Sequence, residues 1–319
     1  MHVWTSLDDV PGDLGQTVVT LGNFDGVHQG HRAVLARVVE QATSRGAVSV
    51  AVTFEPHPIA VLYPERAPRM ITSVPQRLQL LADTGLDAVL VLDFTVEFAQ
   101  LTPEEFVASV FVDALHASAV VVGGDTRFGV RNSGNVDTLR ALGVALGFEV
   151  VTLDDLGNGP RWSSSMVRDL LAVGDVAGAA AVLGRPHRVS GTVVHGDHRG
   201  RELGYPTANL SQDAGGLIPA DGVYAGWLTR IEQEPGTPDR VLPAAISIGT
   251  NPTFDGIQRR VEAYVLDRTD LDLYGEEVGY EFVARLRPTV RFDGIEPLIR
   301  QMETDVGQCR EILRSIVPS

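Results

Sequence analysis

The 319-residue sequence contains no lysine, because all 26 of its basic residues are arginine. This absence excludes the common phosphate-binding loop, whose signature requires a glycine followed by a lysine. If the protein binds ATP, it must therefore use histidine, arginine, backbone amides and metal. We attach no further meaning to the missing lysine, since a genome with biased codon usage would have the same effect.

Cysteine and long apolar runs are also scarce. The single cysteine, Cys309, excludes an intramolecular disulfide and a cysteine-rich zinc site. No run of 18 or more apolar residues occurs, so we expect no membrane-spanning helix. The first residues lack the basic start and apolar core of a secretory signal peptide. These features favour a cytoplasmic enzyme.

The charge and the length of the chain limit its expected partners and its number of domains. A net charge of −15 repels polyanions, so we expect neither nucleic acid nor membrane among the partners. Small nucleotides remain possible, because a local cluster with Mg²⁺ can overcome the global field. A chain of this length favours two domains.

The first half predicts an α/β domain. Apolar runs rich in valine and bounded by Gly, Asp or Pro predict buried strands, and amphipathic stretches with helical spacing separate them. This alternation predicts a Rossmann-like parallel sheet covered by helices on both faces, with ligands at the carboxyl ends of the strands. The predicted strands are 17–21, 47–54, 88–94, 119–123 and 148–153.

The pattern changes near Gly184-Arg185-Pro186. Beyond it, short β-type runs separated by turn clusters predict a small antiparallel barrel. A closing helix follows, with apolar residues at Ile295, Leu298, Ile299 and Met302. We therefore predict domains over 1–184 and 185–319. The predicted barrel strands are 189–194, 222–230, 241–249, 259–267 and 277–287.

The segment 22–31, Gly-Asn-Phe-Asp-Gly-Val-His-Gln-Gly-His, lies between the first strand and a helix. His28 and His31 are three residues apart on the first helical turn, so they project to the same side. The helix start favours an anion, and the imidazoles add donors to a triphosphate. For the His-x-Gly-His motif alone, a turn with capped or solvent-facing histidines is equally reasonable. The position between strand and helix favours the phosphate site.

This segment resembles the nucleotidyltransferase signature of the bacterial bifunctional riboflavin kinase/FMN adenylyltransferase family, also called FAD synthetases. Segments 53–58, 122–129 and 162–168 match the same family. By itself, the Ser163-Ser164-Ser165 run would more simply be a helix N-cap. The resemblance implies that His28 and His31 are catalytic. It implies ATP contacts at Gly22, Asn23, Phe24, Asp25, Gly30, Ser164 and Arg168, and flavin contacts at Pro56, His57, Pro58, Asp125, Arg127 and Phe128.

The segment 191–210 carries the second group of candidate residues. Its glycines and arginines resemble a phosphate loop built from backbone amides. Thr207 and Asn209 are two residues apart, so both point to one face of an extended chain, and their oxygens suit Mg²⁺. Glu262 alternates with Val261 and Ala263 and therefore faces away from these apolar side chains. Without further context, a plain strand and a solvated glutamate would be the simpler interpretations.

This segment resembles the riboflavin kinase module of the same family, as do 219–224, 248–254, 261–264 and 272–275. The resemblance implies that Thr207 and Asn209 hold Mg²⁺ and that Glu262 deprotonates the terminal ribityl hydroxyl of riboflavin. It implies ATP contacts at Gly196, Arg199, Gly200, Arg201, Gly204 and Pro206.

Together, the two resemblances imply two ATP-dependent reactions. The C-terminal module would phosphorylate riboflavin to FMN, and the N-terminal module would adenylylate FMN to FAD with release of pyrophosphate. ATP, riboflavin, FMN and FAD are then the expected ligands, with self-association possible. Two alternatives stay open: an enzyme with one activity on the same scaffold, and a non-catalytic sensor of flavins or nucleotides. Intact candidate catalytic residues argue against the sensor.

Overall fold

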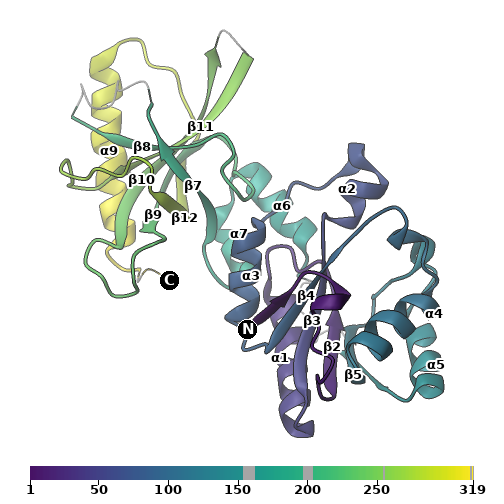
Figure 1. Cartoon of the computed structure of the whole chain (residues 1–319). Helices are drawn as coiled ribbons and strands as arrows, with labels where there is room; N and C mark the ends of the chain where they lie inside the picture. The colour runs from purple at the N-terminus through teal and green to yellow at the C-terminus, as the bar shows by residue number, and fades with distance from the viewer. Residues whose placement is uncertain (154–161, 197–203, 254–255, 317, 319) are drawn as a thin grey trace. The chain divides into compact units, whose positions relative to one another are not determined.

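The computed structural model describes residues 1–153, 162–196, 204–253, 256–316 and 318 (Figure 1). Its contacts divide the chain into two compact units. The first comprises Met1–Arg69 and Val74–Trp162, and the second comprises Met70–Ser73 and Ser163–Ser319. This division follows spatial contacts, so the residues between 163 and 184 lie with the second unit. The predicted module boundary at Gly184 stays a prediction.

The first unit contains a six-stranded sheet in the order β1-β4-β3-β2-β5-β6, and all of its strand pairs are parallel. The order reverses at β2, which pairs with β3 on one side and β5 on the other. The strands are β1 (His2–Trp4), β2 (Thr17–Leu21), β3 (Val48–Glu55), β4 (Ala88–Asp93), β5 (Ala117–Gly123) and β6 (Glu149–Leu153). This confirms the predicted parallel sheet.

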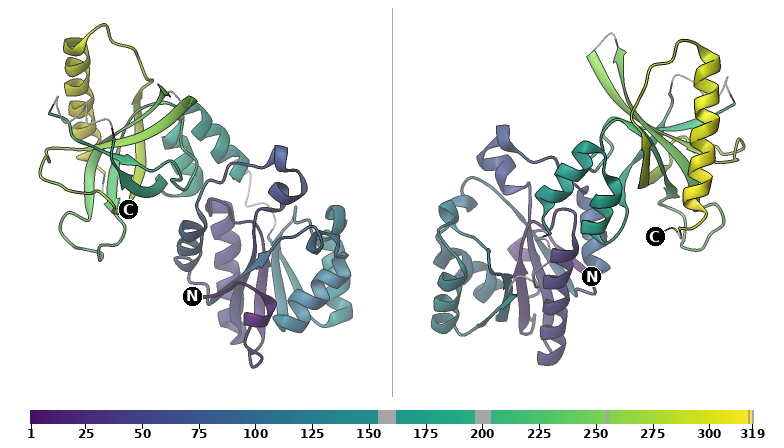
Figure 2. Two further views of the ribbon diagram at one scale, coloured as in Figure 1. Left: turned by 45° about the horizontal axis from the view of Figure 1, so that its top comes forward. Right: turned by 180° about the vertical axis from the view of Figure 1, so that it is seen from behind.

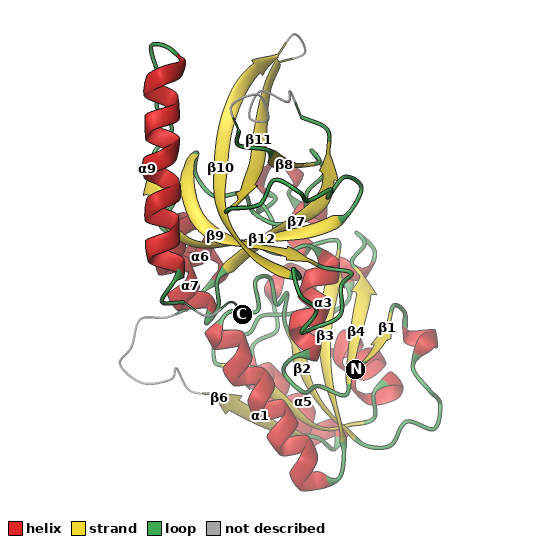
Figure 3. Ribbon diagram, turned by 90° about the vertical axis from the view of Figure 1, so that its left-hand side faces the viewer, coloured by secondary structure: helices red, strands yellow, loops and turns green. Residues whose placement is uncertain are grey.

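Both faces of the sheet are covered, as predicted. Val18 packs in one apolar cluster with Leu35 of α1 and Leu81 of α3. Its neighbour Val19 packs in a second cluster with Phe111 and Leu139. Figure 3 shows α1 lying along the strands. The α-helices of this unit are α1 (Gln29–Arg45), α2 (Pro58–Leu62), α3 (Val74–Ala82), α4 (Pro103–Phe106) and α5 (Val136–Leu146), and α4 continues into a π-helix at Val107–Ala114.

The second unit contains a closed barrel in the order β10-β11-β8-β7-β12-β9. Each neighbouring pair with a described register is antiparallel, which confirms the predicted barrel. The backbone N–H of Leu217 donates to the carbonyl of Ile71, which ties the segment 70–73 to this unit. The strands are β7 (His187–Val194), β8 (Thr207–Leu210), β9 (Gly222–Arg230), β10 (Val241–Thr253), β11 (Gly256–Val265) and β12 (Glu277–Arg287).

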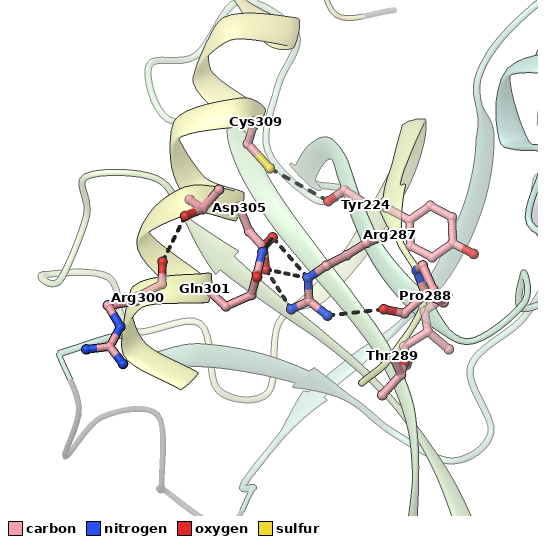
Figure 4. Close-up of polar contacts among 10 residues, drawn as sticks. Tyr224, Arg287, Pro288, Thr289, Arg300, Gln301, Asp305 and Cys309 are labelled. Atoms are coloured by element: carbon pink, nitrogen blue, oxygen red, sulfur yellow. Dashed lines mark hydrogen bonds and ion pairs between the residues drawn. The ribbon is translucent and has the colours of Figure 1, made fainter. Parts of the chain in front are cut away.

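The described residues of this unit also form the helices α6 (Ser164–Val173), α7 (Val176–Leu183) and α9 (Ile295–Leu313). Figure 2 shows α9 running alongside the barrel strands in both views. Arg287 at the end of β12 forms an ion pair with Asp305 of α9 at 2.7 Å, and Gln301 donates to the same carboxylate (Figure 4). The thiol of Cys309 lies 3.9 Å from the carbonyl of Tyr224. This is the predicted closing helix.

β1 was not predicted, and β8 was expected only as an extended segment and not as one of the barrel strands. β1 has three residues, and only Trp4 among them is buried, so it carries no hydrophobic period. β8 begins at Thr207, and its polar residues Thr207 and Asn209 interrupt the apolar pattern that marks a buried strand. Both strands are defined by pairing with distant segments, β1 with β4 and β8 with β11.

Candidate active sites

The parallel sheet gathers the predicted adenylyltransferase loops at one edge. The segment 22–28 follows β2, the segment 56–58 follows β3, and the segment 124–129 follows β5. Because these strands are parallel neighbours, their carboxyl ends lie at the same side of the sheet. The order also reverses there, which is the usual place for a ligand in an open α/β sheet.

His28 and His31 are held together at the start of α1. His28 is the N-cap of the helix, and its Nδ1 accepts a hydrogen bond from the backbone N–H of His31 at 3.3 Å. The two rings stack with centroids 3.7 Å apart and an interplanar angle of 20°. A ring whose Nδ1 accepts carries its proton on Nε2. The cap therefore leaves His28 with an Nε2–H donor, so the capping and phosphate-binding interpretations are compatible.

The Nδ1 atom of the His31 ring is buried. It lacks a hydrogen-bond partner within the described part of the chain. Phe24 packs edge-on against the ring, with centroids 5.3 Å apart. Burial, followed by repulsion from His28, holds the pKa of His31 well below its ordinary value. His31 is therefore a neutral imidazole near pH 7 in the ligand-free protein.

Backbone shape explains two features of this loop. Phe24 and Val27 both have positive φ, 48° and 39°, which is unusual for residues with large side chains. At Gly30, a Cβ would lie 3.1 Å from the His28 ring. A side chain at this position would thus crowd the imidazole, which accounts for the glycine between the two histidines.

The predicted flavin residues lie on the neighbouring loops. His57 is buried and caps α2, because its Nδ1 accepts from the N–H of Ile59 at 3.1 Å. Pro56 follows a cis peptide bond, and Pro58 opens the helix. The structure thus gives this loop a fixed turn and short helix beside the loop of His28.

The third loop combines exposed polar residues with a buried ring. Asp125 and Arg127 are exposed, and Arg127 donates to the carbonyl of Thr126. Phe128 is buried and packs against Phe106 at 6.0 Å between ring centroids. The aromatic series continues through Phe98 to Phe54 at the end of β3. An apolar wall therefore runs beneath the edge where the loops meet.

The predicted residues Ser164 and Arg168 are on α6, in the second unit. Ser163 caps this helix, since its hydroxyl accepts from the N–H of Met166 at 3.2 Å. The predicted helix start is therefore confirmed, and the two residues' contact with ATP stays a prediction.

The predicted kinase residues converge on two paired strands. Glu262 of β11 lies directly opposite Asn209 of β8 in the antiparallel register. The hydroxyl of Thr207 lies 3.4 Å from Oε2 of Glu262, and Nδ2 of Asn209 lies 3.5 Å from the same hydroxyl. Val261 and Ala263 are buried, whereas Glu262 is half-buried. The structure therefore brings Thr207, Asn209 and Glu262 together, although the sequence predicted a shared face only for Thr207 and Asn209.

Two further residues shape this site. A Cβ on Gly196 would lie 2.6 Å from the Asn209 side chain, so any residue other than glycine would displace that side chain. The buried hydroxyl of Tyr280 donates to the carbonyl of Ala208 at 2.8 Å, between the two predicted metal ligands. Burial, with the charge of Glu262, raises the pKa of Tyr280, so this donor stays protonated.

Other predicted kinase residues are placed only in part. Gly204 has a φ of 84°, and Pro206 directly precedes β8. Arg199, Gly200 and Arg201 lie outside the described residues. His195, which directly follows β7, packs against Tyr274 with ring centroids 4.0 Å apart.

The donors of the barrel site fit a hard divalent cation. A threonine hydroxyl and an asparagine carbonyl are oxygen ligands of the kind that Mg²⁺ takes, with substrate phosphates and water completing the shell. The described residues contain no cluster of three or more His, Cys, Asp or Glu suited to a metal. A metal bound by ATP oxygens fits these residues better than an ion held by protein ligands alone.

Arg77 and Tyr280 were not predicted to act in either site. Arg77 looks like an ordinary polar residue of an amphipathic helix, yet its side chain is 1% exposed. Tyr280 looks like an ordinary strand aromatic. No local pattern distinguishes them, because their contacts with Asn23 and Ala208 join residues that are distant in sequence.

Comparison with known proteins decides the family. The sequence model of FAD synthetase matches residues 11–166, and that of riboflavin kinase matches residues 183–313. A bifunctional riboflavin kinase/FMN adenylyltransferase from Escherichia coli (strain K12) is 35% identical over 95% of this chain and 94% of its own length. The chain belongs to this family. The bifunctional riboflavin kinase/FMN adenylyltransferase from Listeria monocytogenes is 36% identical over 92% of this chain and 91% of its own length.

Family membership confirms the predicted class of protein, an enzyme of FAD biosynthesis with an FAD synthetase region followed by a riboflavin kinase region. A crystal structure described as a macrolide-efflux protein from Streptococcus pneumoniae shares the fold, with a TM-score of 0.84 and 30% identity. It covers 99% of each chain. Among the described residues of the present chain, no helix is long and apolar enough to span a membrane.

Proposed function

We propose that this member of the bifunctional riboflavin kinase/FMN adenylyltransferase family makes FAD in two steps, one in each module. The module from residue 185 onward transfers the γ-phosphate of ATP to riboflavin, which gives FMN and ADP. The module over residues 1–184 adenylylates FMN with a second ATP, which gives FAD and pyrophosphate. The convergence of Thr207, Asn209 and Glu262 on paired strands is the observation that carries the kinase step of this proposal.

In the kinase step, Glu262 accepts the proton of the terminal ribityl hydroxyl. Such a base contributes about 10²–10⁴-fold, and the rest of the acceleration comes from positioning and charge neutralisation. Thr207 and Asn209 would hold Mg²⁺, which when bound neutralises charge on the ATP phosphates. Gly196, Gly204 and Pro206 bind ATP, as do Arg199, Gly200 and Arg201.

In the adenylylation step, His28 and His31 donate hydrogen bonds to the phosphates of ATP as negative charge develops on them. Gly22, Asn23, Phe24, Asp25 and Gly30 form the loop around the nucleotide. Ser164 and Arg168 stay predicted ATP contacts. The flavin lies on Pro56, His57, Pro58, Asp125, Arg127 and Phe128. This assignment is supported by the position of the three loops, which follow the carboxyl ends of neighbouring parallel strands at one edge of the sheet.

One incubation tests the proposal. Purified protein is mixed with riboflavin, ATP and Mg²⁺, and the products are separated by chromatography. FMN followed by FAD is the expected result. FMN without FAD would instead identify an enzyme with kinase activity alone. Binding of flavin without turnover would identify a sensor. A cytoplasmic location and the absence of nucleic-acid partners belong to the same proposal, on the grounds of charge and composition.

A further inference from the structure

Arg77 is a buried arginine that contacts two loops at the edge of the parallel sheet. It lies in α3, and its Nη1 donates to the carbonyl of Asn23 at 3.3 Å. Its Nη2 donates to the carbonyl of Phe54 at 3.3 Å and to the carboxylate of Glu55 at 2.7 Å. One guanidinium thus joins the loop after β2 to the end of β3.

Stability alone explains this arrangement poorly. Arginine is seldom fully buried, because removing its charge from water is costly. The ion-pair partner Glu55 is 41% exposed, so solvent screens the attraction. Moreover, Nε of Arg77 is buried without a hydrogen-bond partner among the residues described. The other two contacts are to backbone carbonyls, which fix positions rather than neutralise charge.

The carbonyl of Asn23 is fixed twice. The hydroxyl of Thr53, which is fully buried in β3, donates to the same oxygen at 3.3 Å. Asn23 directly precedes Phe24, whose positive φ of 48° is a strained conformation that the surroundings must hold. Arg77 and Thr53 together fix the backbone carbonyl of the residue that precedes this strained one.

We propose that Arg77 is a positioning residue for FMN adenylylation. Its rigid fork sets the loop that holds ATP relative to the loop that holds flavin, so that the FMN phosphate is aligned with the α-phosphorus of ATP. This inference rests on the proposed function of the two loops. Misplacement by about 1 Å can cost about 10²-fold in rate, which is why a residue outside the reacting groups would matter.

The test is Arg77→Lys in the full chain. Lysine keeps the charge but replaces the five-donor fork by a single ammonium, which does not reach both loops in the same geometry. We expect kcat for FAD formation from FMN and ATP to fall about 10²-fold. The KM values for ATP and FMN should change far less, and riboflavin phosphorylation should not change. Amide hydrogen exchange should show that β2 and β3 stay protected.

Arg37→Lys is the matched control, because Arg37 forms an exposed ion pair with Glu40 on α1 and should tolerate the same replacement. Wild-type kcat in Arg77→Lys would overturn the inference while leaving the proposed function intact. Wild-type protein that makes no FAD would instead overturn the function. If Arg77→Lys loses protection in β2 and β3, its loss of activity could come from misfolding. Thr53→Val then tests the inference instead, since it removes the second donor to Asn23 at nearly constant volume. An unchanged kcat in that variant would overturn the inference.

Discussion

Glu262 lies directly opposite Asn209 where β11 pairs with β8. The pairing brings a carboxylate from one strand to a hydroxyl and an amide from the other, with Thr207 3.4 Å from Glu262. Because both strands belong to a closed barrel, the register cannot slip without disrupting the rest of the sheet. The relative positions of the candidate base and the candidate metal ligands are therefore set by the backbone.

Glu262→Gln should lower riboflavin phosphorylation by about 10²–10⁴-fold, because the amide cannot accept the proton. FAD formation from supplied FMN should continue, since that reaction uses the other module. Both rates are read from one chromatographic assay. Glu277→Gln on β12 is the control, because Glu277 is exposed. Undiminished phosphorylation in Glu262→Gln would exclude Glu262 as the base.

His31→Ala should lower FAD formation by about 10²–10³-fold, because one hydrogen-bond donor to the developing phosphate charge is lost. FMN formation from riboflavin should persist. His2→Ala, at an exposed position on β1, provides the control. Equal loss of both activities would show that the histidine does not act in the adenylylation step alone.

Gly196→Ala should weaken the response of the kinase to Mg²⁺. The added Cβ would lie 2.6 Å from the Asn209 side chain and displace it. We expect the Mg²⁺ concentration for half-maximal FMN formation to rise, and FAD formation from FMN to be unaffected. Gly307→Ala on α9, where an added Cβ has open space, is the control. An unaltered Mg²⁺ response would contradict the assignment of Asn209.

His187 should make the stability of the barrel depend on pH. It is buried, its Nε2 lies 2.6 Å from the carbonyl of Leu217, and burial lowers its pKa to about 4. Between pH 6.5 and pH 4, the unfolded chain binds a proton that the folded chain does not. The free energy of unfolding therefore falls with decreasing pH, by up to about 1.4 kcal/mol per pH unit, and is unaffected by His187 above pH 6.5.

The measurement is the urea midpoint of unfolding at pH 7 and pH 5. The midpoint should drop at pH 5, and the drop should be smaller in His187→Gln, which has no group that titrates. If wild type and variant respond equally to pH, another group controls the acid sensitivity.

Asp305→Asn should destabilise the closing helix. Asp305 is buried and accepts from two nitrogens of Arg287, whose side chain is only 19% exposed. Removing one member of a buried ion pair costs about 3 kcal/mol, the lower end of the usual range, because Arg287 retains some contact with water. Urea unfolding measures the loss. Glu311→Gln, exposed on the same helix, should be neutral.

The sequence predicts regular elements of this fold better than their exceptions. Buried valine runs identify β2 to β6, and the alternation around Glu262 identifies its face. The predicted strand 241–249 ends early, because β10 continues to Thr253 through Asn251 and Pro252, which are poor strand residues. β8 shows no apolar pattern of a barrel strand, because the polar candidate residues Thr207 and Asn209 interrupt it. Where polar residues replace apolar ones, the hydrophobic period that marks a strand is lost.

Arg77 illustrates why some contacts near the candidate site cannot be predicted from the sequence. A buried arginine and an exposed one have the same local sequence pattern in an amphipathic helix, and only the fold brings Asn23 and Glu55 to the same guanidinium. Candidate site residues that belong to a motif can be predicted from the sequence. A residue such as Arg77 cannot, because its partners are distant along the chain.

The single thiol also has a practical consequence. Burial, with the nearby Asp305 carboxylate, raises the pKa of Cys309 to about 12, so its reactive thiolate is rare at neutral pH. A cysteine introduced at Val144, which is 90% exposed, would be the preferred target for a maleimide dye. Since no side chain carries a primary amine, the native chain is already a background suited to site-specific fluorescent labelling.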